Sequence, residues 1–176
     1  DGGAETFTAL DSIDGRAGKD TLNAIITGTL ETAGVTVQSV ETVNVIAAAA
    51  VTAADVSGFT SLETLNVVSS GNIAGVVASA TTDINVANGL AGVAVNGGKD
   101  VTITNGTAGN INVGATTAAA GNVTATNNFA TGTVTVKGAG TLTATSNDGA
   151  ITFVNGTTVT ANAKEAVSLA TRDANI

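Results

Sequence analysis

The side chains with the most chemical potential in this sequence are its carboxylates, and they are concentrated near the N-terminus. Nine of the fourteen acidic residues lie within residues 1–63, whereas residues 101–176 contain only Asp148, Glu165 and Asp173. Carboxylate oxygens are hard ligands that suit divalent cations such as calcium. We therefore expect any bound cation to lie in the N-terminal third of the chain.

One glycine-rich segment brings several of these acids close together in sequence. Residues 14–22 read Asp-Gly-Arg-Ala-Gly-Lys-Asp-Thr-Leu, and residues 3–7 (Gly-Ala-Glu-Thr-Phe) have the same shape as residues 18–22. Glycines allow the backbone to turn tightly and direct its carbonyls inward, and aspartate adds a hard oxygen. The two half-sites predict calcium ligands among Glu5, Asp11, Asp14, Gly15, Gly18 and Asp20.

The same segment can also be explained without a metal. Gly15 and Gly18 would then form an ordinary turn with solvated aspartates, and the positive charges of Arg16 and Lys19 would oppose a cation. Calcium takes about six to eight oxygen ligands, which is more than one such motif supplies. A site here therefore needs backbone carbonyls, the neighbouring half-motif or residues outside this sequence.

Two further acids, Asp83 and Asp100, precede apolar–polar alternations in successive repeats and could stack close together. A carboxylate pair could serve as acid and base in a carbohydrate-active β-helix, but no Trp, Tyr or His accompanies it. We expect these acids to cap strands, with a calcium contact as their favoured functional role.

The composition excludes most other chemistry. Histidine, cysteine, methionine, proline, tryptophan and tyrosine are absent. Disulfides, Ser–His and Cys–His nucleophiles, and thiolate or imidazole metal sites are therefore excluded. A net charge of −8 and only four phenylalanines disfavour binding to nucleic acid. No apolar run is long enough for a membrane span, and we expect no enzymatic activity.

Short β-strands must position these residues. Alternating apolar and polar phrases recur around Val43, Leu65, Ile84 and Val101, at intervals that shorten along the chain, and later phrases follow more closely still. The small inward residues favour an all-β, β-solenoid fold (parallel β-helix-like) with irregular coils, in one repetitive domain over residues 1–176. A β-sandwich is the alternative, because Asn155–Gly156 could form a hairpin turn. Helix is expected only as a minor component within residues 47–56.

The motifs quoted above carry a family resemblance. Residues 14–22 resemble the calcium-binding nonapeptide of RTX proteins, with Arg16 where its second glycine belongs. The order of residues 18–23, 34–45 and 57–67, followed by strands rich in Thr, Ala and Asn, resembles the repetitive body of RTX-type bacterial surface-layer proteins.

The resemblance implies a secreted structural protein that requires calcium and assembles into an S-layer lattice on the surface of a Gram-negative bacterium. It implies export by a type I system, RTX-like calcium-binding coils in residues 1–30 and β-strand repeats in residues 31–176. On this interpretation the chain is part of a larger protein. Its main partner is itself, and cell-surface polysaccharide would bind through regions outside this sequence.

Two binding functions are the alternatives: a secreted RTX-type adhesin and an ice-binding β-solenoid. For the ice-binding alternative, a flat ladder of the frequent outward Thr-x-Thr pairs could order water. The variable spacing of the strands argues against a regular array, and threonine also suits any exposed strand face. The pairs are Thr102/Thr104, Thr124/Thr126, Thr133/Thr135, Thr141/Thr143/Thr145 and Thr158/Thr160.

Overall fold

The chain forms a β-solenoid of about seven turns. The computed structural model describes residues 10–27, 30, 32–52, 54–88, 92–105, 109–129 and 131–170. Every regular element in these segments is a β-strand, and residues 47–56, where helix was expected, instead contain the short strand β5. All paired strands are parallel, which confirms the predicted solenoid and excludes the sandwich, whose sheets are antiparallel.

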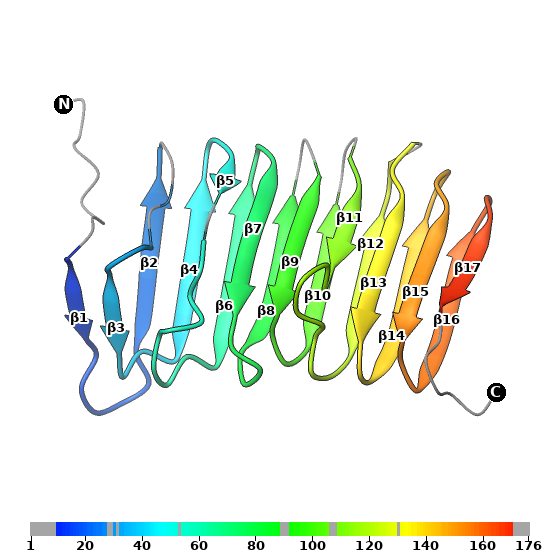
Figure 1. Ribbon diagram of the computed structural model, residues 1–176. Helices are drawn as coiled ribbons and strands as arrows, with labels where there is room; N and C mark the ends of the chain where they lie inside the picture. Colours follow the sequence, from blue (N-terminus) through cyan, green and yellow to red (C-terminus); the bar gives the residue numbers. More distant parts are fainter. Residues whose placement is uncertain are drawn as a thin grey trace.

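Two large sheets face each other across the core, and the coils stack from β1 at one end to β17 at the other (Figure 1). We call the eight-stranded sheet sheet I and the seven-stranded sheet sheet II. Sheet I consists of β2 (Thr21–Ile26), β4 (Thr42–Ala47), β6 (Thr64–Ser69), β8 (Asp83–Asn88), β10 (Val101–Asn105), β12 (Val123–Asn127), β14 (Thr141–Ser146) and β16 (Thr158–Ala163).

Sheet II lies opposite, and a small third sheet accompanies the first coils. Sheet II consists of β5 (Val51–Thr52), β7 (Ile73–Ala78), β9 (Val93–Gly97), β11 (Ile111–Val113), β13 (Val134–Gly138), β15 (Ile151–Asn155) and β17 (Val167–Ala170). The third sheet pairs β1 (Ser12–Asp14) with β3 (Thr36–Gln38).

The strand register of sheet I explains the spacing of the repeats. Val43, Leu65, Ile84 and Val101 occupy the same position in adjacent strands, so each interval between them is the length of one complete coil. The shorter intervals later in the sequence separate consecutive strands that belong alternately to sheets II and I. The strands therefore keep their alignment while the loops absorb the differences in coil length.

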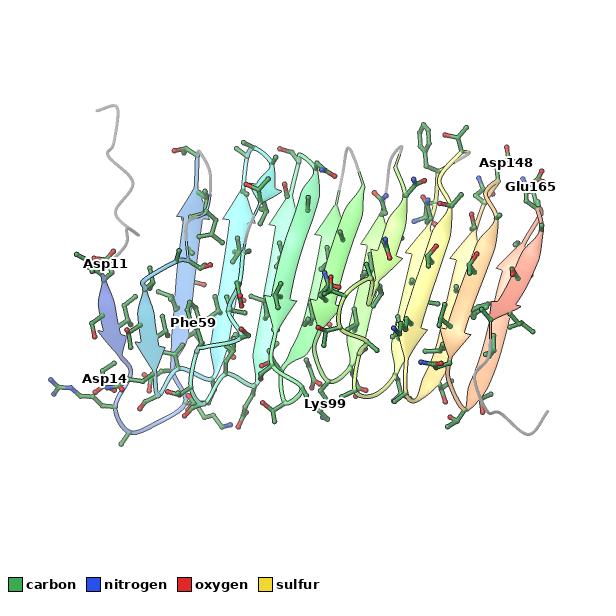
Figure 2. The ribbon with its side chains drawn as sticks, viewed as in Figure 1. Asp11, Asp14, Phe59, Lys99, Asp148 and Glu165 are labelled. Atoms are coloured by element: carbon green, nitrogen blue, oxygen red, sulfur yellow. The ribbon has the colours of Figure 1, made fainter. Side chains whose placement is uncertain are left out.

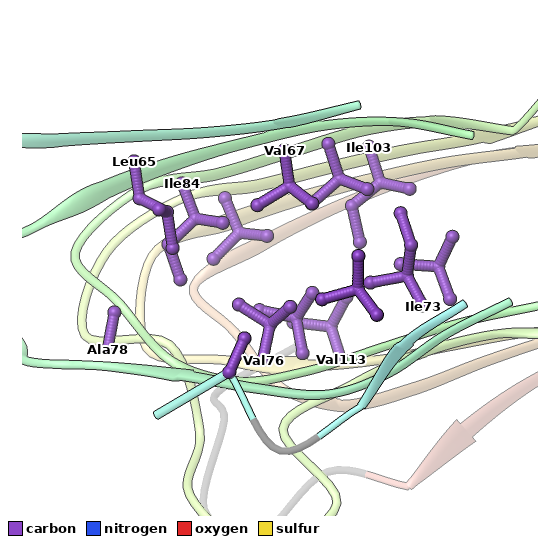
Figure 3. Close-up of a cluster of buried hydrophobic side chains, with 14 of the residues drawn as sticks. Leu65, Val67, Ile73, Val76, Ala78, Ile84, Ile103 and Val113 are labelled. Atoms are coloured by element: carbon purple, nitrogen blue, oxygen red, sulfur yellow. The ribbon is translucent and has the colours of Figure 1, made fainter. Parts of the chain in front are cut away.

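Small aliphatic side chains fill the narrow interior between the sheets. Leu65, Ile84 and Ile103 from sheet I face Ile73 and Val113 from sheet II (Figure 3). These five side chains are at most 1% exposed. Each buried side chain of this size contributes about 1.5–3 kcal/mol relative to an exposed one. The same inward position therefore supports stability in every coil, although the chain has few aromatic residues.

Buried polar side chains stabilise the tight turns where sheet I strands end. The Asn127 amide donates to the carbonyl of Gly109 at 2.9 Å and accepts from the Phe129 N–H at 3.0 Å. Ser146 makes the equivalent pair of bonds, donating to Gly132 at 3.1 Å and accepting from Gly149 at 3.0 Å. These bonds satisfy backbone groups that the turn removes from water, which explains why Asn and Ser occupy otherwise apolar positions.

Candidate calcium-binding turn and outer surface of sheet I

The glycine-rich turn predicted as a calcium site connects β1 to β2. A Cβ atom added to Gly15 would overlap the carbonyl oxygen of Ser39, so only glycine fits there. Gly18 has a φ of 139° and Arg16 a φ of 68°. Arg16 thus adopts a left-handed conformation that glycine tolerates best, at the position where the resembling motif has glycine.

Asp14, at the end of β1, is exposed and already hydrogen-bonded. Its carboxylate accepts the backbone N–H of Arg16 at 2.8 Å. This bond is the main cause of a lowered pKa for Asp14, and the side chains of Gln38 and Ser39 lower the pKa further. Asp11 lies at the other end of β1 from Asp14 (Figure 2). Glu5, another predicted ligand, lies outside the described residues.

Asp20 is the residue of this turn that best fits a cation ligand. Its Oδ2 atom is buried and has no hydrogen-bond partner among the described residues. The atom lies beside Gly18, where an added Cβ would be 3.5 Å from Oδ2. A buried carboxylate oxygen without a partner costs free energy, and a bound cation would remove that cost.

The acidic side chains near Asp20 do not form a metal-binding group in the described part of the chain. In the described segments, no group of three or more Asp or Glu side chains is arranged to hold a metal. A calcium ion here would therefore depend on Asp20 together with backbone carbonyls and water, which are common calcium ligands.

Two glutamates beside Asp20 were not predicted as site residues. Because Thr21, Thr42 and Thr64 are in register, the preceding residues Asp20, Glu41 and Glu63 lie at the same edge of successive coils. Glu41 Oε2 accepts the Asp20 N–H at 2.8 Å. The signal in the sequence was the repeated acid-Thr-apolar-Asn phrase at residues 20–23, 41–44 and 63–66.

Lys19 is held by this acidic edge. Its Nζ lies 2.6 Å from Glu63 Oε2, and this bond raises the pKa of Lys19. Both side chains are well exposed, so the ion pair contributes little to stability. The ion pair matters for the electrostatics of the turn, because Glu63 partly neutralises the positive charge of Lys19, which would otherwise oppose a cation.

Asp83 and Asp100 lie close together at the start of adjacent strands of sheet I, as predicted. Asp83 Oδ1 accepts the Asp100 N–H at 3.4 Å and lies 3.5 Å from Lys99 Nζ. Asp100 Oδ1 accepts the Asn122 N–H at 2.7 Å. These bonds support the predicted strand-capping role. Asp83 and Asp100 lie at the starts of β8 and β10, which are the third and fourth strands from β2 in sheet I. The pair is therefore separate from the turn at Asp20, and a calcium contact by either residue stays a prediction.

The outward face of sheet I carries two regular columns of side chains. We call them the first and second outward columns. The first column begins with four asparagines and the second with four aliphatic residues, and in each column a threonine-rich half follows. The first column is Asn23, Asn44, Asn66, Asn85, Thr102, Thr124, Thr143 and Thr160; the second is Ile25, Ile46, Val68, Ala87, Thr104, Thr126, Thr145 and Asn162.

The threonine halves of these columns correct one sequence-based interpretation. The variable strand spacing argues against a regular array of the Thr-x-Thr pairs. Four successive strands nevertheless hold their outward threonines in register, because the irregular lengths lie in loops and in the alternation between sheets. Thr135, in contrast, lies in sheet II and does not belong to this array.

In the described segments, no helix is long and apolar enough to cross a membrane.

Comparisons with known proteins give the chain no family. No family model matches the sequence, and no curated protein or solved structure shows significant similarity to it.

Proposed function

We propose that this chain is a structural module of a secreted bacterial surface layer, that it self-associates in the presence of calcium, and that it has no catalytic role. The observation that carries this proposal is the buried, unpartnered Oδ2 atom of Asp20, at the edge where Glu41 and Glu63 also lie. Location on a Gram-negative cell, type I export and attachment to polysaccharide through other regions are parts of the proposal that rest on the sequence resemblance.

The last coil leaves core positions uncovered. β16 and β17 are the outermost strands of their sheets in the described part of the chain. Val167 and Leu169 are 46% and 56% exposed, whereas their register partners Ile151 and Phe153 are fully buried. Unpaired strand edges beside exposed core residues favour the addition of further β-structure. Further β-structure, from the same chain or from another, would cover these residues.

Calcium would act at the other end of the solenoid, where Asp20 offers an unpartnered oxygen. Asp20, Glu41 and Glu63 place several negative charges along one edge, and the whole chain has a net charge of −8. A divalent cation would reduce repulsion within this edge and between neighbouring molecules. Calcium binding and assembly are therefore expected to be coupled.

The direct test is to image the purified chain by electron microscopy and follow its sedimentation, with calcium and then with excess chelator. We expect ordered assemblies with calcium and their dissolution by the chelator. Magnesium at the same ionic strength is the control for simple charge screening. A chain that stays monomeric at every calcium concentration, or assembles equally in the chelator, contradicts the proposal.

A second candidate function, recognition of ordered water or ice, is favoured by the regular threonine array. Threonine is restricted at χ1, so its methyl and hydroxyl groups repeat at fixed orientations. The columns repeat at about 4.8 Å across strands and about 6.7 Å along them. Thermal hysteresis that is lost in Thr124→Lys, but kept in Thr52→Lys on sheet II, would support this function. No hysteresis in the unmodified chain excludes it.

A further inference from the structure

The tripeptide Val-Asn-Gly occurs twice in the chain, each time at the end of a strand of sheet II. Val95-Asn96-Gly97 lies at the end of β9, and Val154-Asn155-Gly156 lies at the end of β15. Asparagine followed by glycine readily loses its side-chain amide, because glycine leaves the next backbone nitrogen unhindered. Both asparagines have the same residue on each side, so the fold decides which of them reacts.

Deamidation of asparagine is an intramolecular substitution that needs only water. The backbone nitrogen of the following glycine loses its proton to hydroxide and forms a bond to the side-chain Cγ atom. The bond from Cγ to the amide nitrogen then breaks, and this nitrogen takes up a proton and leaves as ammonia. Water opens the five-membered imide at either carbonyl carbon, which yields aspartate or isoaspartate. The reaction therefore requires a glycine N–H and a side-chain amide that no other group holds.

The fold holds both reacting groups of the first tripeptide. Asn96 Oδ1 accepts the N–H of Thr116 at 2.8 Å and the N–H of Thr117 at 3.3 Å. The Gly97 N–H donates to the carbonyl of Thr117 at 2.8 Å. The Asn96 amide cannot turn toward the Gly97 nitrogen without breaking these bonds, which costs free energy. The fold therefore protects this site from deamidation.

Neither reacting group of the second tripeptide is held in this way. Within the described residues, the Gly156 N–H donates to no carbonyl, and the Asn155 side chain forms no hydrogen bond. Both residues are partly exposed, so solvent has access to them. The next N–H, that of Thr157, donates to the carbonyl of Gly140 at 2.9 Å, which fixes the far side of the turn without engaging Gly156.

The turn between β15 and β16 requires this labile sequence. Asn155 and Gly156 have φ values of 65° and 89°, in the left-handed region that asparagine and glycine tolerate best. A Cβ atom added to Gly156 would lie 2.7 Å from two carbon atoms of Leu142, so a larger residue does not fit. The glycine that makes Asn155 reactive is therefore also the residue that the turn needs.

We infer that Asn155 is a site of spontaneous deamidation in the folded protein, whereas Asn96 is protected. Each event adds one negative charge to a chain with a net charge of −8. Isoaspartate also lengthens the backbone by one carbon atom between β15 and β16. This weakens the attachment of β16, which pairs only with β14 in the described part of the chain. The inference is independent of the proposed function, because the reaction needs only water.

Peptide mapping by mass spectrometry tests the inference on the unmodified chain. The folded protein is incubated at mildly alkaline pH in water enriched in heavy oxygen, and the deamidated fractions at Asn155 and Asn96 are followed over time. We expect deamidation at Asn155 to be at least about tenfold faster, because reaction at Asn96 first requires its hydrogen bonds to break. Incorporated heavy oxygen identifies the events that occur during the incubation. Labelling by an isoaspartyl methyltransferase detects the second product independently.

The unfolded chain is the matched control. In concentrated guanidinium chloride the hydrogen bonds of Asn96 are absent, so the two sites should react at similar rates. Equal rates in the folded protein overturn the inference. A difference that persists unchanged in the denaturant also overturns it, because the cause would then be the local sequence.

Asn155→Gly provides a second measurement, since it removes the amide and still permits a left-handed φ. This variant should keep its melting temperature during an incubation in which the natural chain loses stability. An equal loss of stability in both chains contradicts the predicted weakening of the last coil by deamidation at Asn155.

Discussion

The Asn66 side-chain amide donates to the Oδ1 atom of Asn44 at 2.8 Å, one coil earlier in sheet I. Asn44 donates in turn to Asn23 at 2.7 Å, and Asn85 donates to Asn66 at 3.0 Å. Each asparagine in the middle of this ladder is therefore both donor and acceptor. The ladder links four coils on the outer surface, on the side of the sheet opposite the apolar core.

Loss of one central member should destabilise the stack. Asn66→Ala removes two of these hydrogen bonds, and at about 0.5–1.5 kcal/mol each we expect a loss of roughly 1–3 kcal/mol. Urea unfolding followed by circular dichroism measures it. Asn128→Ala, at an exposed position outside the ladder, should change stability by less than about 0.5 kcal/mol. Equal effects of the two substitutions would show that the ladder is not stabilising.

Asp20 should control calcium binding. Asp20→Asn keeps the shape of the side chain but removes its negative charge, so we expect at least a tenfold weaker affinity by isothermal titration calorimetry. The calcium-induced rise in melting temperature should decrease in parallel, because binding to the folded state is the source of that rise. Asp148→Asn, at the opposite end of the solenoid (Figure 2), is the control with the same charge change. A variant at Asp20 that binds calcium normally would place the ligand elsewhere.

Arg16 should be replaceable by glycine with a gain in stability. Its φ of 68° is unfavourable for a residue with a Cβ, and Arg16→Gly removes that cost. After allowance for the greater freedom of glycine in the unfolded chain, we expect a gain of about 0.5–1 kcal/mol in chemical denaturation. The backbone N–H that bonds Asp14 is retained in the variant. Ala17→Gly, which has no positive φ to relieve, should instead be neutral or destabilising.

Asp14 should contribute to stability in a pH-dependent way. Its folded-state pKa is lowered from 3.8, chiefly by the hydrogen bond from the Arg16 N–H. A lowered pKa means that the folded state prefers the ionised carboxylate. The contribution is therefore complete well above pH 3.8 and is lost as the pH falls through the lowered folded-state value.

Asp14→Asn tests this pH dependence. The difference in urea midpoint between the natural chain and this variant should be larger at pH 7 than at pH 2.5. A difference that does not change between these pH values would assign the effect to packing instead of ionisation.

Much of the fold could be predicted because period-two alternation and small inward residues have direct structural meanings. The alternation identified the strands around Val43, Leu65 and Ile84, and their spacing corresponded to complete coils. The site was less predictable. The contact between Asp20 and Glu41 joins residues in successive coils, and only the strand register brings them together.

The sequence by itself indicated an all-β chain and favoured a solenoid, because strand alternation and small inward residues are local properties that can be recognised without the fold. The tertiary structure decided which strands share a sheet, that the threonines align, and that Ile25, Ile46 and Val68 form an exposed ridge. The physical reason is that alternation fixes the face on which a side chain lies, whereas its neighbour in the next coil depends on how much chain the intervening turns absorb.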